Sequence, residues 1–249
     1  MKEKITLVTG ASRGIGRATA LLLARHGHKV CINYRNKETQ AAEVVSEIRS
    51  AGGTAIAISA DLADEHQIIG MFNRLDDEFG PLTGLVNNAG ILLPQSSIED
   101  IRADRLQQIF SVNVSGSFIC AREAVKRMSA RHGGNGGSIV NVSSAASRLG
   151  SPGEYIDYAA SKGAIDSLTR GLSLEVAAYG VRVNAVRPGF IYTEMHADGG
   201  EAGRVDRVSA ALPMKRGGHP EEVAEAIHWL LSDAASYVTG NFIDLAGGK

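Results

Sequence analysis

The sequence predicts an α/β fold, in which helices cover both faces of a doubly wound, mostly parallel sheet. Two observations carry this prediction. Short β-branched runs alternate with longer amphipathic stretches along almost the whole chain of 249 residues, the pattern of repeated strand–helix–strand units. Most of these runs are also apolar on both faces, which is typical of strands that helices cover on both sides.

The expected strands and helices alternate in order. The strands lie at 5–8, 29–33, 54–58, 84–88, 138–142 and 181–186, with a short final strand near 241–245 at one edge. The helices lie near 15–27, 38–51, 65–79, 104–131, 155–179 and 220–232. The glycine-rich 132–137 indicates a turn, whereas 190–218 is a long segment without clear period, typical of lids and binding loops. We expect one domain over 1–249, with a substrate-binding loop at about 190–218.

Charge and composition exclude several classes of function. The chain has 26 basic and 27 acidic residues without blocks of like charge, so neither nucleic acid nor an anionic membrane is an expected partner. The N-terminal apolar run is too short for a signal peptide and no run is long enough to span a bilayer, so we expect a cytoplasmic protein. Cys31 and Cys120 are interpreted as buried free thiols, and the histidines, which form no zinc motif, as surface or capping residues.

A glycine-rich turn follows the first expected strand and opens the first expected helix. Its sequence, TGASRGIG, contains Gly10, Gly14 and Gly16 in a GxxxGxG spacing, which differs from the GxGxxG fingerprint by a longer turn. Glycines let backbone N–H groups approach a pyrophosphate, and the helix N-terminus adds partial positive charge. Ser12 and Arg13 supply further donors. The position favours a dinucleotide site, with a plain connector as the alternative.

Other short motifs follow this turn in a recognisable order: NNAG at 87–90, Asn113, Ser144, YAASK at 158–162 and PG at 188–189. With them the sequence resembles the short-chain dehydrogenase/reductase family over essentially its full length. It looks most like the bacterial branch of 3-oxoacyl carrier-protein reductases and glucose-1-dehydrogenase-like oxidoreductases, two names that disagree about substrate. The resemblance implies a single-domain Rossmann fold with a seven-stranded sheet, and a homotetramer built partly on helices 104–131 and 155–179.

The resemblance also implies a nicotinamide cofactor and its contacts. Asp61 matches the family position that binds adenine, and Lys162 would hold the nicotinamide ribose. NNAG taken alone indicates no more than a tight turn at a strand end. The expected cofactor-binding residues are Gly10, Ser12, Arg13, Gly14, Ile15, Gly16, Tyr34, Arg35, Asn36, Asp61, Leu62, Asn87, Ala89, Gly90, Tyr158, Lys162, Pro188, Gly189, Ile191 and Thr193.

The end of the second expected strand predicts NADP(H) in preference to NAD(H). An NAD site typically has an acid there, which accepts from the ribose 2′-hydroxyl and would repel a 2′-phosphate. This chain has Tyr34, Arg35 and Asn36 instead, with Arg13 able to point at the same space. Two arginines suit bidentate contacts with a phosphate. The alternative is that Arg35 is a solvated loop residue.

Tyr158 is the expected general acid or base. Lys162 lies four residues later, so the two side chains share one helix face. Hydride transfer needs a group that delivers or removes a hydroxyl proton. A tyrosine pKa is ordinarily about 10, and we expect the ammonium, helped by an oxidised nicotinamide, to lower it by roughly 1 to 3 units. Tyr155 has Ala159 at the corresponding position and is the weaker candidate.

Two further polar residues complete the expected catalytic set. Ser144 follows a strand, where it can donate to the substrate oxygen; Ser143 is an alternative because the spacing to Tyr158 is one residue longer than the family usually has. Asn113 matches the family asparagine that supports a water-linked proton relay to Lys162. We therefore expect an oxidoreductase that interconverts a small-molecule carbonyl and a secondary alcohol. The alternatives are a non-catalytic NADP sensor and, less favoured, a nucleoside-dependent methyltransferase. Substrates that suit 190–218 include a sugar, an acyl thioester and a small ketone.

Overall fold

Seven strands form one sheet in the order β3-β2-β1-β4-β5-β6-β7. The computed structural model describes residues 3–249, and within them all six neighbouring strand pairs are parallel. The strands are β1 (Lys4–Val8), β2 (His28–Tyr34), β3 (Thr54–Ser59), β4 (Gly84–Asn87), β5 (Gly137–Val142), β6 (Val181–Pro188) and β7 (Phe242–Leu245). The predicted α/β fold is confirmed, and the sheet is parallel throughout its described part, where the sequence predicted a mostly parallel one.

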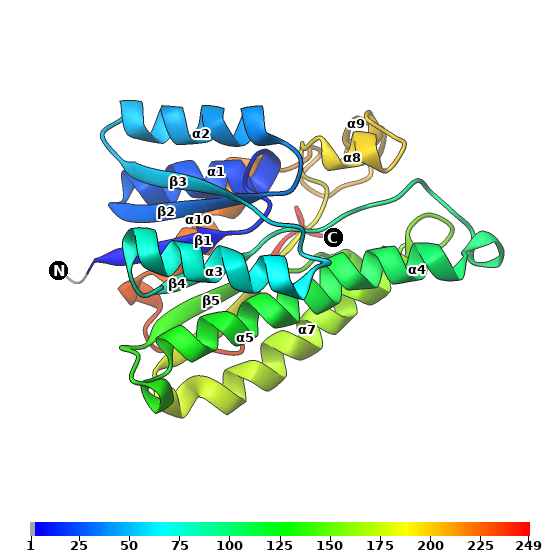
Figure 1. Ribbon diagram of the computed structural model, residues 1–249. Coiled ribbons are helices and arrows are strands. Elements are labelled where there is room, and N and C mark those ends of the chain that lie inside the picture. Colours follow the sequence, from blue (N-terminus) through cyan, green and yellow to red (C-terminus); the bar gives the residue numbers. More distant parts are fainter. Residues whose placement is uncertain (1–2) are drawn as a thin grey trace.

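Helices cover both faces of this sheet (Figure 1). One face carries α1 (Gly14–Arg25), α2 (Glu38–Ser50) and α10 (Pro220–Leu231). The other carries α3 (Glu65–Phe79), α5 (Ser117–Met128) and α7 (Ile156–Val176). Because the strands are parallel, their carboxyl ends all lie at the same edge of the sheet, which is where α/β proteins bind their ligands.

Each face of the sheet has its own apolar core. Val30 and Ile32 of β2 pack into the core under α1, α2 and α10, whereas Cys31 between them packs into the core under α3 and α5. This alternation is the reason for the apolar runs seen in the sequence, because both sides of each strand are buried. Cys31 and Cys120 are free and buried, as expected. Burial raises the pKa of the Cys120 thiol to about 12 and that of Cys31 further.

The expected helix 104–131 is divided into three parts. α4 (Ala103–Phe110) leads into a π-helix (Ser111–Gly116), which leads into α5. Gly116 is packed so closely that a Cβ there would lie 2.5 Å from the Leu62 carbonyl oxygen. The wider π turn carries Asn113 into the interior, where it is fully buried. Such turns occur frequently at functional sites.

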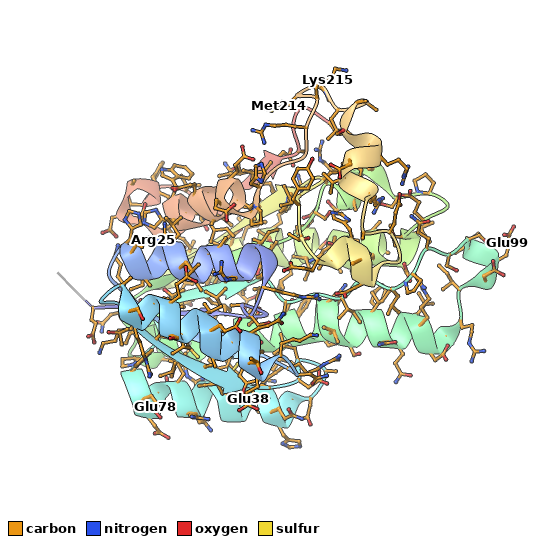
Figure 2. All side chains as sticks on the ribbon, turned by 90° about the horizontal axis from the view of Figure 1, so that it is seen from above. Arg25, Glu38, Glu78, Glu99, Met214 and Lys215 are labelled. Atoms are coloured by element: carbon orange, nitrogen blue, oxygen red, sulfur yellow. The ribbon has the colours of Figure 1, made fainter. Side chains whose placement is uncertain are left out.

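The segment 190–218 has more regular structure than expected. It contains two short helices, α8 (Met195–Asp198) and α9 (Arg204–Ser209), which are too short for helical periodicity to show in the sequence. Its two ends are joined, because Ile191 and Gly218 form a parallel bridge and the Tyr192 N–H donates to the Gly218 carbonyl at 2.9 Å. Figure 2 shows Met214 and Lys215 at its outer tip. The segment is therefore a long loop whose two ends lie together at the edge of the sheet.

One prediction about the histidines is wrong. His28 is neither a surface nor a capping residue, because it is 5% exposed and its Nδ1 lies 2.9 Å from Thr6 Oγ1. Burial lowers the pKa of His28 to about 4. Within residues 3–249, no helix is long and apolar enough to cross a membrane, and no three His, Cys, Asp or Glu residues gather as metal ligands.

Candidate active site

A cavity of about 260 Å³ lies where β1 to β4 end. It brings together most of the residues that the sequence predicted to hold a dinucleotide. Those that line it are Gly10, Ser12, Arg13, Gly14, Ile15, Tyr34, Arg35, Asn36, Asp61, Leu62, Ala89, Gly90 and Thr193. Turns that are far apart in the sequence thus meet at one sheet edge, as the parallel topology requires.

The glycine turn is held so tightly that side chains are excluded from it. Gly10 has a φ of +61°, and a Cβ there would lie 2.9 Å from the Ala89 Cα. A Cβ on Gly16 would lie 2.6 Å from the Gly10 carbonyl oxygen, so Gly16 permits the turn to close on the helix without lining the cavity. Asn88 fastens the turn from β4, because its Nδ2 donates to the Thr9 and Gly10 carbonyls at 2.8 and 3.1 Å. This cradle of backbone suits a pyrophosphate.

The two arginines of the cavity already have acidic neighbours. The Arg13 guanidinium is hydrogen-bonded to the carboxylate of Asp198 on α8. The Nη1 of Arg35 lies 3.9 Å from the Asp61 Oδ2, with half of the Arg35 side chain exposed. The sequence predicted the position of both residues but neither partner. α8 is consequently tied across the cavity to the glycine turn.

A second cavity, of about 120 Å³, continues from the first. The two share Ile15, Asn88, Thr193 and Met195, so they lie side by side. The residues here that the sequence predicted as catalytic or nicotinamide-binding are Ser144, Tyr158, Lys162, Pro188, Gly189 and Ile191. The predicted proton-transfer groups therefore lie at the far end of the predicted dinucleotide cavity.

Tyr158 and Lys162 share one face of α7, as their spacing predicted, with Lys162 Nζ 5.5 Å from the centre of the phenol ring. The ammonium donates to the Val142 carbonyl at 2.7 Å. The expectation of a lowered tyrosine pKa is wrong for the protein alone. Burial raises the pKa of Tyr158 to about 12, against the smaller opposing effects of Ser144 and Arg204, and burial lowers the pKa of Lys162 to about 8.

The two candidate serines have different surroundings. Ser143 Oγ donates to Asp166 Oδ1 at 2.7 Å and to the Lys162 carbonyl at 3.2 Å, so its hydroxyl is committed to holding β5 against α7. Ser144 Oγ accepts from the Ala146 N–H at 3.1 Å, but its own proton is only weakly engaged, with the Pro188 carbonyl at 3.4 Å, and the hydroxyl lies close enough to Tyr158 to affect its pKa. The geometry favours Ser144, in spite of the extra residue between it and Tyr158.

Two of the predicted asparagines lie behind the cavities, lining neither. Asn87 donates from Nδ2 to Asn141 Oδ1 at 3.0 Å, which joins β4 to β5 inside the core. Asn113 accepts from the Ile91 N–H at 2.8 Å and donates to Ser161 Oγ at 3.2 Å. Asn113 therefore fixes the strand-end loop against α7, whereas Asn87, predicted to lie beside the cofactor, is part of the core.

The family model described as enoyl-(acyl carrier protein) reductase matches residues 10–249. The chain is 65% identical to the oxidoreductase YgfF of Escherichia coli, over 98% of this chain and 99% of that one. It is 40% identical to a 3-oxoacyl-[acyl-carrier-protein] reductase of Synechocystis, over 100% and 97%. A solved short chain dehydrogenase of Burkholderia cenocepacia, in complex with NADP, superposes with a TM-score of 0.89 at 35% identity, covering 98% of this chain and 97% of that one.

The chain belongs to the short-chain dehydrogenase/reductase family. It is an oxidoreductase of that family. The predicted resemblance and fold are thereby confirmed.

Sequence reasoning missed two features of this dehydrogenase/reductase site. Asn88, the second residue of the NNAG motif, lines both cavities and ties the glycine turn, whereas its neighbour Asn87 was chosen. Strand alternation offered a signal, because residues next to each other at a strand end point to opposite faces. Tyr155, set aside as the acid or base, is 1% exposed and donates to the Gly199 carbonyl at 3.0 Å, which fastens the segment 190–218 to α7.

Proposed function

We propose that this oxidoreductase uses NADP(H) to interconvert a ketone and a secondary alcohol, with Tyr158 as the general acid and base. The observation that carries the proposal is the placement of Tyr158, Lys162 and Ser144 in a cavity that adjoins the one lined by the glycine cradle. A backbone cradle at a helix N-terminus suits a pyrophosphate, and the adjoining cavity suits the nicotinamide end of a dinucleotide.

Each residue of the set has a distinct task in carbonyl reduction. A bound nicotinamide supplies the hydride. The Tyr158 hydroxyl donates its proton to the substrate oxygen as that oxygen gains charge, and Ser144 Oγ donates a hydrogen bond to the same oxygen. Lys162 holds the cofactor ribose, and its ammonium favours the phenolate that forms. Asn113, through Ile91 and Ser161, positions the loop and helix that carry these groups, and supports a proton relay toward Lys162.

The phenol pKa supports the direction of reduction. A tyrosine with a pKa raised to about 12 remains protonated at neutral pH, so its hydroxyl is present as the proton donor that reduction needs, whereas oxidation needs the phenolate. We propose that the protein favours carbonyl reduction with NADPH, and that alcohol oxidation requires the positive charge of oxidised nicotinamide to bring the pKa down.

The preference for NADP(H) is supported by the charges around the adenosine end. No acid directly follows β2, where Tyr34, Arg35 and Asn36 line the cavity, and Arg13 of the glycine turn lines the same cavity. The structural relative from Burkholderia cenocepacia was solved with NADP. A 2′-phosphate at this end would meet two guanidinium groups, each able to form charge-assisted hydrogen bonds.

The test is NADPH consumption with a panel of ketones, acyl thioesters and sugars, followed by absorbance. We expect turnover with at least one class, and stronger binding of NADPH than of NADH. A protein that binds NADPH and reduces no member of any class is a sensor, the alternative that the fold allows. Protein without affinity for NADPH would contradict the proposal altogether.

We also propose that the chain works as one domain, with 190–218 as the substrate-binding loop, and assembles as a homotetramer. The loop is supported by Met195, which lines both cavities. Assembly is supported by an apolar hollow on α4 and α7, in which Leu106, Phe110 and Ile156 are each more than a third exposed. Light scattering at micromolar concentration should give four times the chain mass of 26.2 kDa, and a monomer would contradict this assembly.

A further inference from the structure

Arg204 on α9 is a cation buried in the wall of the substrate cavity. Its side chain is 10% exposed, and its guanidinium lies 4.5 Å from the ring centre of Tyr155 and 5.2 Å from that of Phe190. It is close enough to Tyr158 to lower the phenol pKa slightly against the effect of burial. The mechanism proposed above assigns no task to this residue. A buried arginine so near the reacting groups therefore calls for a physical explanation.

The charge of Arg204 is already balanced. Its Nη2 donates to Glu154, which also accepts from Arg207 at 3.3 Å. Arg207 in turn donates to Glu201 at 2.8 Å. Two guanidinium groups thus face two carboxylates, and the cluster has no net charge. An anionic group of a substrate would find no uncompensated positive charge here.

One hydrogen-bonding atom of Arg204 nevertheless remains unused. Among the residues that the structure describes, its buried Nε has no partner. An arginine Nε can only donate, and a buried donor without an acceptor costs free energy. Arg204 lines the same cavity as Tyr158, so a substrate in that cavity is the group that can complete the bond.

His196 on α8 lines this cavity too and presents the complementary atom. Its Nε2 lies 3.0 Å from the Ile191 carbonyl oxygen, which can only accept, so Nε2 carries the proton. Burial keeps the imidazole neutral by lowering its pKa. The buried Nδ1 is then an acceptor, and it too has no partner within residues 3–249. Arg204 and His196 line the same cavity, so one substrate can face both residues.

Part of the cavity lining is apolar and is formed by Leu92, Leu149, Phe190 and Met195. One unused donor and one unused acceptor thus belong to two residues of the same cavity, beside an apolar part of its wall. A hydroxyl group satisfies both, because its oxygen accepts from Arg204 Nε and its proton is donated to His196 Nδ1. A carboxylate would place its lone pairs against that of Nδ1, and an alkyl group would leave both atoms unpaired.

We propose that Arg204 and His196 bind a hydroxyl group of the substrate, so that the preferred substrates are hydroxyketones. This specificity rests on the proposed ketone reduction. Sites that hydrogen-bond a substrate hydroxyl reject the analogue without it much more strongly than apolar pockets distinguish a methylene. Arg204 and His196 therefore discriminate between ketones with and without a hydroxyl group, which Tyr158 alone would reduce at similar rates.

The test compares matched ketones in which a methyl replaces the hydroxyl. Hydroxyacetone is compared with butanone. 4-Hydroxybutan-2-one is compared with pentan-2-one, and 5-hydroxypentan-2-one with hexan-2-one. Levulinate serves as the anionic probe. We expect kcat/KM to be at least about ten-fold higher for the hydroxyketone in one or more pairs. Equal values in every pair would overturn the proposal, as would a preference for levulinate, which would indicate recognition of charge.

Two variants and a control locate the effect. Arg204→Met and His196→Leu should each lower the hydroxyketone-to-alkyl-ketone ratio of kcat/KM toward one. Arg207→Met removes a guanidinium of the same cluster that is half exposed and outside the cavity wall, and should leave the ratio unchanged. Any effect of Arg204 on the Tyr158 pKa acts on both ketones and cancels in the ratio. An unchanged ratio in Arg204→Met, with NADPH binding retained, contradicts the proposal.

If the protein does not reduce ketones, hydroxyl binding by Arg204 and His196 can still be tested separately. A protein that binds NADPH and reduces neither ketone contradicts the proposed function. In that case the two ketones are compared by the shift they cause in the melting temperature of the NADPH complex. A larger shift with the hydroxyketone, lost in Arg204→Met, supports the hydroxyl site, and equal shifts overturn it.

Discussion

The two walls of the active site are built differently. The wall from α7 and β5 belongs to the regular core, where Lys162 is held by the Val142 carbonyl and Ser143 by Asp166. The opposite wall, from 190–218, lies outside the sheet. It is attached by Tyr155 to Gly199, by Arg13 to Asp198, by Arg204 and Arg207 to Glu154, and by the bridge at Ile191. The first wall carries the groups proposed for proton transfer, and the second carries those proposed to recognise the substrate.

The largest expected effect is on kcat, and it distinguishes Tyr158 of the first wall from Tyr155, which holds the second wall. Tyr158→Phe should reduce kcat by about a thousand-fold or more and leave NADPH binding within a few-fold, because only the proton-transfer hydroxyl is lost. Tyr155→Phe is the matched control, which removes the hydroxyl bonded to Gly199 and should raise KM by a few-fold at nearly unchanged kcat. Steady-state kinetics and fluorescence titration with NADPH measure both. Comparable losses of kcat in the two variants would contradict the assignment.

The next prediction concerns the free energy of unfolding, which we expect the buried Lys162 ammonium to lower. Burial lowers its pKa from 10.5 to about 8, so below pH 8 the folded protein bears the cost of a buried ammonium. Lys162→Met should be inactive yet about 2 kcal/mol more stable at pH 7, after about 1 kcal/mol is subtracted for the lost bond to Val142. Urea unfolding of the protein without cofactor measures this.

The pH dependence of that difference has a definite sign. Between pH 8 and 10.5 the unfolded wild type binds a proton that the folded state does not, so the stability of the wild type rises with pH in this window. The advantage of Lys162→Met should therefore disappear by pH 10.5. An advantage that stays constant from pH 7 to 10.5 would show that the ammonium is not the cause.

At the adenosine end, Arg35→Ala should raise the KM for NADPH about ten-fold or more and barely change that for NADH. The loss of a guanidinium facing a 2′-phosphate removes a charge-assisted bond that NADH never makes. The control is therefore the second cofactor in the same variant. Equal losses with NADPH and NADH, or a wild type that favours NADH, would exclude Arg35 from recognising the phosphate.

The smallest effect concerns the tie between the two walls. Asp198→Asn weakens the ion pair with Arg13, which leaves that guanidinium free for the 2′-phosphate and removes a negative charge from the cavity rim. We expect the KM for NADPH to fall about two- to five-fold, because exposed ion pairs contribute about 1 kcal/mol or less. Kinetics with both cofactors check this. A higher KM would indicate that NADPH binding needs α8 to be held against the glycine turn by this ion pair.

Sequence reasoning predicted the first wall well and the second poorly, for physical reasons. Buried parallel strands leave an apolar run, and a lysine at i+4 from a tyrosine must share its helix face, so β1 to β7 and the pair Tyr158 and Lys162 were predictable. The helices α8 and α9 are shorter than the stretch over which periodicity can be recognised.

The errors within the site also have specific causes. The π turn that buries Asn113 depends on the close contact of Gly116 with Leu62, which is a tertiary contact invisible in the spacing. The Tyr158 pKa rises because burial outweighs the hydrogen bond with Ser144 and the charge of Arg204, and the Lys162 ammonium is engaged with the Val142 carbonyl. The preference for Ser144 over Ser143 depends on Asp166, which engages the Ser143 hydroxyl and which no motif includes.

The two core cysteines make the protein a reporter of its own unfolding. Both thiols are buried under α3 and α5, and the pKa of each is raised to about 12 or beyond, so neither offers a thiolate to an alkylating reagent while the fold is intact. Modification by iodoacetamide must then wait for the sheet to open. The rate at which mass increases by two labels in mild denaturant should follow global opening, which gives a measure of stability that requires neither cofactor nor substrate.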